Sequence, residues 1–130
     1  MAQRIKVFIA DDMIELRSNV RRMLSTIDNV RVVGEAGDGE EALKLIRELS
    51  PHVVLMDINM PKLDGLKATE TLTKERPNIQ VIIMSIQSEQ EYFRRAMKAG
   101  AKDFLTKPFS GSELSEAILN VFNQWVKDTP

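Results

Sequence analysis

The chain has 130 residues, the usual size of a single domain with one hydrophobic core. It carries 18 Lys and Arg against 19 Asp and Glu, which excludes a strongly basic nucleic-acid binder, so we expect no direct nucleic-acid contact. The absence of cysteine excludes a disulfide scaffold, a thiolate metal site and cysteine catalysis. No apolar run exceeds four residues and the N-terminal residues lack a signal-peptide core, so we expect a cytoplasmic protein without a membrane span.

Strand and helix patterns alternate along the whole chain. Apolar runs rich in β-branched residues predict buried strands, mixed polar and apolar segments predict edge strands, and apolar spacings of three and four predict helices. In chain order the predicted elements are strand 7–10, helix 13–27, strand 31–36, helix 40–49, strand 53–56, helix 65–76, strand 81–84, helix 90–99, strand 103–106 and helix 112–127.

This alternation predicts an α/β fold. Parallel neighbours need a crossover, so five strand-helix units predict a parallel sheet with helices on both faces. The first, third and fourth strands are the most apolar and belong in the middle, and right-handed crossovers then favour the flavodoxin-like (βα)5 order 2-1-3-4-5. We expect one domain over 1–130, with a core at 5–126 and a tail or the start of a linker at 127–130.

Acidic, hydroxyl and lysine side chains follow four of the predicted strands. The first strand ends at Asp11 and Asp12, the third at Asp57, the fourth at Ser85 and the fifth at Lys107. The carboxyl ends of parallel strands share one edge of the sheet, so we expect the three carboxylates within reach of one ion. An all-oxygen acidic site suits Mg2+, and the lysine and hydroxyl would complete a cradle for a transferring phosphoryl group.

At these residues the chain resembles the response-regulator receiver domain of bacterial two-component signalling. The resemblance extends from about residue 5 to residue 126. It rests on the Asp11-Asp12 pair, the segment 53–65, the Met84-Ser85 step, the run 100–104 and the triplet Lys107-Pro108-Phe109.

The resemblance implies a role for each acidic residue. Asp57 would be the phosphoacceptor, taking a phosphoryl group from the phosphohistidine of a sensor histidine kinase to form an acyl phosphate. Asp12 and Asp57 would bind Mg2+ directly together with the backbone carbonyl of Asn59. Asp11 would act largely through water.

Further residues match the family's switch and rate-tuning positions. Lys107 would pair with a phosphoryl oxygen, the Ser85 hydroxyl would bond another in the active state, and Phe104 would turn inward as the hydroxyl moves. The resemblance also implies a cis peptide bond between Lys107 and Pro108.

Three neighbouring positions would tune the reaction rates. Asn59 and Gln87 occupy the variable positions that help to set phosphoaspartate lifetime in the family. Ile86 stands where a small residue is common, and its bulk would narrow access to the phosphoryl site.

The resemblance also implies partners. These are the kinase and an output partner or fused effector domain. The output partner would bind the surface of the fourth helix, fifth strand and fifth helix, and a second copy of the chain could bind there as well. Segment 84–110 is most similar to receivers joined to an ATPase of the pilus-assembly type. Catalysis would be limited to the domain's own phosphorylation and dephosphorylation, so we expect no enzyme in the usual sense.

Alternative interpretations remain open from the residues alone. An aspartyl-phosphate phosphatase usually needs a carboxylate two residues after the nucleophile, where Asn59 stands. A flavin or nucleotide carrier needs a phosphate loop that the first strand lacks. A receiver-like interaction module would not need the intact carboxylates and lysine. At single positions, Asp12 could merely cap a helix, Phe104 could merely pack in the core, and His52 is expected on a surface loop.

Overall fold

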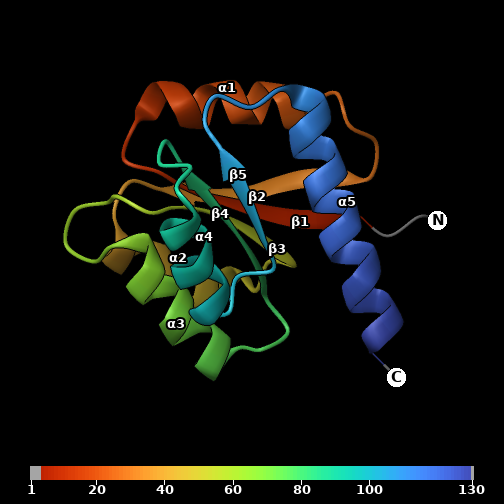
Figure 1. Ribbon diagram of the computed structural model, residues 1–130. Coiled ribbons are helices and arrows are strands. Elements are labelled where there is room, and N and C mark those ends of the chain that lie inside the picture. Colours follow the sequence, from red (N-terminus) through yellow and green to blue (C-terminus); the bar gives the residue numbers. More distant parts are fainter. Residues whose placement is uncertain (1–3, 130) are drawn as a thin grey trace.

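The computed structural model describes residues 4–129, so Pro130 of the expected tail lies outside the described residues. The elements alternate as expected and are shown in Figure 1. Their bounds are β1 (Ile5–Ala10), α1 (Ile14–Leu24), β2 (Val30–Ala36), α2 (Gly39–Leu49), β3 (Val53–Asp57), α3 (Gly65–Glu75), β4 (Gln80–Ser85), α4 (Gln90–Lys98), β5 (Asp103–Thr106) and α5 (Gly111–Asp128).

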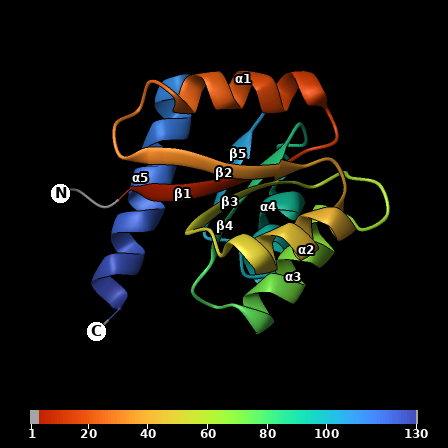
Figure 2. The ribbon, with the colours of Figure 1, turned by 180° about the vertical axis from the view of Figure 1, so that it is seen from behind.

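The five strands form one parallel sheet in the order β2-β1-β3-β4-β5, which confirms the predicted topology. Helices α1 and α5 cover one face, and α2, α3 and α4 cover the other, as the opposite views in Figures 1 and 2 show. The molecule is therefore a three-layer α/β sandwich.

Each face of the sheet has its own hydrophobic core, because successive side chains of a strand point to opposite faces. In β1, Phe8 and Ala10 join the core under α2, α3 and α4, whereas Val7 and Ile9 join the core under α1 and α5. All residues of β3 and β4 are buried. This two-sided burial explains the continuous apolar runs of the central strands.

The largest boundary difference is at α1, which ends at Leu24 and not at residue 27. The hydroxyls of Ser25 and Thr26 donate to the carbonyls of Arg22 and Met23, and Asn29 has a positive φ of 68°. These local bonds replace the last predicted turn, because hydroxyl side chains compete for helical carbonyls.

The last helix starts one residue earlier and ends one residue later than predicted, at Gly111 and Asp128. Its start is set by a capping box in which the Ser110 hydroxyl and the Glu113 carboxylate each accept from the other's backbone N–H. Across residues 4–129, none of the helices is long and apolar enough to cross a membrane.

Helix α3 begins against the end of β3. The N–H of Gly65 donates to the carbonyl of Ile58 at 2.7 Å, and a Cβ at Gly65 would lie 1.9 Å from the carbonyl oxygen of Asp57. Only glycine permits this approach of the two backbones. The turn after β3 is therefore held tightly under the carboxyl edge of the sheet.

Candidate functional site

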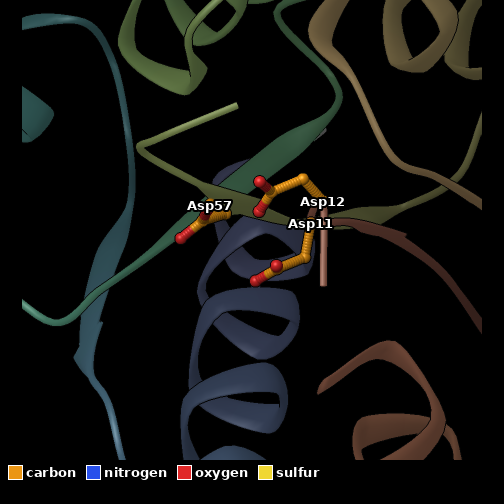
Figure 3. Close-up of side chains that lie close together, drawn as sticks. All are labelled: Asp11, Asp12 and Asp57. Carbon is orange, nitrogen blue, oxygen red and sulfur yellow. The ribbon is translucent and has the colours of Figure 1, made fainter. Parts of the chain in front are cut away.

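Three acidic side chains meet at the carboxyl edge of the sheet (Figure 3). Asp11 and Asp12 follow β1, and Asp57 is the last residue of β3. One carboxylate oxygen from each lies within 4.8 Å of the others. Asp11 is fully buried and Asp57 is 6% exposed, whereas Asp12 faces solvent. The predicted convergence of the three carboxylates is confirmed.

Lys107 reaches this cluster from the end of β5. Its backbone N–H donates to the carbonyl of Ser85 at 2.7 Å, which holds the start of the β5–α5 loop beside β4. Its ammonium Nζ donates to Asp11 Oδ2 at 2.7 Å and to Asp57 Oδ1 at 2.9 Å. The Lys107–Pro108 peptide bond is cis, as the resemblance implies.

The cluster holds more negative than positive charge. Burial of the Asp57 carboxyl is the main cause that raises its pKa to about 6; the charges of Asp11 and Asp12 add to the rise, and Lys107 opposes it. Burial disfavours the charged form of Lys107, but its hydrogen bonds and its attraction to Asp57 and Asp11 outweigh this and raise its pKa. One ammonium thus leaves three carboxylates only partly neutralised.

The donor set fits a hard divalent cation. All three side chains offer carboxylate oxygens, and one ammonium against three carboxylates leaves a formal charge that a divalent ion would cancel. Asp12 lies on the exposed side, so an ion there would remain open to water and to phosphate oxygens, as Mg2+ sites usually are. Asn59 is an exposed residue of the following turn.

Ser85 lies at the end of β4 and is 1% exposed. Its hydroxyl donates to Gln87 Oε1 at 2.8 Å and accepts from the Gln87 backbone N–H at 3.0 Å. Both bonds of the hydroxyl are therefore made to Gln87, two residues further along the chain. Between these residues the Ile86 side chain is 70% exposed, and its predicted effect on access stays a prediction.

Phe104 is half-buried in β5 and packs against the core under α4. Its ring lies 6.0 Å from that of Phe93 on α4, in an edge-to-face arrangement. The contact links β5 to α4. Such a contact is expected both of a switch residue and of a residue that only packs in the core. The switch role of Phe104 stays a prediction.

The structure decides the interpretations of two further residues. Asp12 does not cap α1: the N-cap position is Met13, which has no side-chain cap, and the Met13 N–H donates to Asp11 Oδ1. His52 lies in the loop directly before β3, as expected, and is half-buried there: its Nδ1 accepts from the Lys6 N–H at 2.9 Å, and its ring packs 5.3 Å from that of Phe122.

Arg17 is not singled out by its sequence pattern, yet its side chain contacts the backbone of Asp11 in the acidic cluster. Its guanidinium donates to the carbonyl oxygen of Asp11 at 2.5 Å and to Glu35 at 2.9 Å. The available signal is its position, three residues before Val20 and seven before Leu24, on the buried side of α1.

Comparison with known proteins identifies relatives of the whole domain. A family model described as the response regulator receiver domain matches residues 7–119. Response regulator GacA of Pseudomonas aeruginosa is 43% identical over 118 residues, covering 91% of this chain and 55% of that protein. Chemotaxis protein CheY of Thermotoga maritima is 39% identical over 116 residues, covering 89% of this chain and 96% of that protein.

A solved structure agrees with these matches. The signal receiver domain of response regulator NarL from Mycobacterium tuberculosis superposes with a TM-score of 0.90 at 33% identity, covering 94% of this chain and 98% of that one. The present chain spans about half the length of the GacA proteins that it matches.

Proposed function

Since the chain belongs to the response regulator receiver domain family, we propose that it is a phosphorylation switch with Asp57 as its phosphoacceptor. One observation carries the proposal: the Asp57 carboxylate lies beside Asp11 and Asp12 and is bonded by Lys107 at the carboxyl edge of the sheet. Asp57 thus combines a nucleophilic oxygen with a cation partner and a metal-binding neighbourhood.

In the proposed reaction, an Asp57 oxygen attacks the phosphorus of a kinase phosphohistidine. The P–O bond forms as the P–N bond breaks, and the electron pair returns to the histidine nitrogen, leaving an acyl phosphate on Asp57. Lys107 offsets charge on the phosphoryl oxygens, which is the main work of a phosphotransfer site. Mg2+, when bound, supplies further positive charge there.

The residues proposed to hold Mg2+ are Asp12, Asp57 and the backbone carbonyl of Asn59, with Asp11 acting through water. The three-carboxylate geometry and the unbalanced negative charge support this assignment. Hydrolysis by water returns Asp57 and releases inorganic phosphate. We propose no other catalysis, because Asn59 occupies the place where a phosphatase would carry its second carboxylate.

Output in this proposal follows from Ser85 and Phe104. Phosphorylation draws the Ser85 hydroxyl from Gln87 toward a phosphoryl oxygen, Phe104 turns inward, and the surface of α4, β5 and α5 changes shape. The route would start from the present contacts, in which the Ser85 hydroxyl donates to Gln87 and the Phe104 ring packs against Phe93. A phosphoryl group shifts such an equilibrium only through contacts that differ between the two states.

The proposed partners are a sensor histidine kinase and an output module, in the cytoplasm. The matches include longer proteins and one of nearly equal length, so both a fused effector domain and a separate partner fit. Two matched proteins are named transcriptional regulatory proteins, which favours transcriptional output over the ATPase predicted from residues 84–110. Pairing with a second copy through α4, β5 and α5 remains part of the proposal.

Intact-mass analysis after incubation with acetyl phosphate tests the phosphoacceptor. The wild-type protein should gain one phosphoryl group in Mg2+ and none in EDTA, and Asp57→Asn should gain none in either. Equal gain by both proteins would reject Asp57 as the acceptor. Asp12→Asn is the matched test of the metal site, since it should lose Mg2+ binding while leaving the acceptor in place.

A further inference from the structure

Asp11 is held through every polar atom that it has. Its N–H donates to the carbonyl of Ala36 at 3.0 Å, Oδ1 accepts from the Met13 N–H, and Oδ2 accepts from Lys107. Its carbonyl oxygen accepts from Arg17. A buried carboxylate fixed in this way presents one constant orientation to its neighbours.

The Arg17 contact also bears on Asp12. The carbonyl of Asp11 belongs to the peptide plane that joins Asp11 to Asp12, so a bond that fixes this carbonyl also fixes the direction in which the Asp12 backbone continues. Within residues 4–129 the Asp12 carboxylate itself makes no hydrogen bond or ion pair. Its position in the cluster is therefore set by its backbone.

Glu35 on β2 orients Arg17 in turn. The carboxylate Oε1 of Glu35 accepts from Arg17 Nε at 2.9 Å, which leaves a terminal nitrogen of the same guanidinium for Asp11. The Arg17 side chain is only 16% exposed, so this arrangement is shielded from water. A planar guanidinium can bond two acceptors at fixed angles, whereas a lysine ammonium cannot reproduce that geometry.

We propose that Arg17, oriented by Glu35, is a positioning residue for the metal site, holding the Asp11–Asp12 peptide so that both carboxylates face Asp57. The inference rests on the proposed function and adds to it a residue outside the acidic cluster. Residues that orient metal ligands from behind typically change metal affinity by about 10–100-fold when they are removed.

Arg21 provides a matched control on the same helix. It also pairs with Glu35, but it is 47% exposed and makes no hydrogen bond to Asp11 among the described residues. Removing either arginine deletes an ion pair to Glu35. If these arginines served only to stabilise the fold, the two variants would therefore bind Mg2+ equally well. Only the Arg17 change releases the Asp11 carbonyl.

Isothermal titration with Mg2+ on the full chain tests the proposal. Arg17→Ala should weaken Mg2+ binding by about tenfold or more, and Arg21→Ala should change it less than about twofold, while circular dichroism shows both folded. Glu35→Gln should fall between them, because a neutral amide orients Arg17 less firmly. Equal Mg2+ affinities for Arg17→Ala and Arg21→Ala would overturn the positioning role.

A second pair keeps the test decisive if Arg17→Ala does not fold. Arg17→Lys retains the charge and the aliphatic stem but cannot bond Glu35 and Asp11 together, so it should bind Mg2+ several-fold more weakly than Arg21→Lys. Identical affinities in this pair would equally reject the proposal. Failure of the wild-type protein to bind Mg2+ would instead count against the proposed function.

Discussion

At the scale of single residues, Asp57 is a buried carboxyl group that must be ionised to act as the proposed phosphoacceptor. In the folded protein its pKa is raised to about 6 from an ordinary value of 3.8, chiefly by burial. Keeping this carboxyl ionised therefore costs folding free energy at neutral pH. The cost disappears as pH falls through about 6 toward 4, because the folded state then binds the proton more tightly than the unfolded state does.

Asp57→Asn should accordingly raise the thermal unfolding temperature in EDTA at pH 7.5. The gain over wild type should shrink as the pH is lowered to 4.5, since the wild-type carboxyl becomes neutral in the folded state. Differential scanning calorimetry of both proteins across this range measures the difference. Adding Mg2+ should stabilise the wild type more than the variant. A difference that is independent of pH would show that Asp57 is not held at a raised pKa.

The hydrogen bond from Ser85 to Gln87 would restrain the proposed switch. Moving the Ser85 hydroxyl toward a phosphoryl oxygen breaks its bond to Gln87 Oε1, which costs about 1 kcal/mol. Gln87→Ala should therefore bind beryllofluoride, a phosphoryl mimic, about fivefold more tightly than wild type. Titration with Mg2+ and beryllofluoride measures this change.

A double-mutant comparison isolates the same restraint. In a Ser85→Ala background, Gln87→Ala should have no further effect on beryllofluoride affinity, because the bond that it removes is already absent. The same fivefold gain in both backgrounds would assign the effect of Gln87 to something other than the Ser85 hydroxyl.

At the scale of elements, the junction of β3 and α3 supports the site. Gly65→Ala would bring a Cβ to 1.9 Å from the Asp57 carbonyl, so backbone must shift, and we expect a loss of about 2 kcal/mol in unfolding free energy. Gly111→Ala is the control, since its Cβ would meet only Met23 Cγ at 3.9 Å at the start of α5. Urea unfolding of both variants measures the losses. Similar stabilities would mean that the junction tolerates movement.

All element boundaries except the end of α1 could be predicted from the sequence to within two residues. The run at 103–106 coincides with β5, and the central strands were found because burial on both faces leaves continuous apolar runs. Boundaries set by local side-chain bonds, such as those of Ser25 and Thr26 after α1, were missed because hydroxyls suit both helix and turn.

The parts of the candidate site that lie at strand ends could be predicted from the sequence. The parts that depend on side-chain contacts between different elements could not. Convergence of Asp11, Asp12 and Asp57 follows from parallel strands sharing one edge. The bond from Arg17 to the Asp11 carbonyl joins α1 to the end of β1, and its partner Glu35 lies on β2. No short motif encodes such a three-element contact.

At the scale of the whole molecule, the sheet separates Phe104, the proposed switch residue, from the only tryptophan in the sequence. Phe104 belongs to the core under α4, whereas Trp125 on α5 packs 6.0 Å from His52, which directly precedes β3 at the end opposite Asp57. Mg2+ alone should therefore change Trp125 fluorescence only weakly. A large change on titration of the metal-free protein would show that the ion acts beyond the carboxyl edge.

The central claim is that phosphorylation at Asp57 is transmitted to the surface of α4, β5 and α5. Amide hydrogen exchange, followed by mass spectrometry with and without Mg2+ and beryllofluoride, measures this transmission directly. We predict altered protection in the loop after Asp57 and also across residues 87–105, with the second change reduced in Ser85→Ala. Altered protection confined to the loop after Asp57, with residues 87–105 unchanged, would contradict the account.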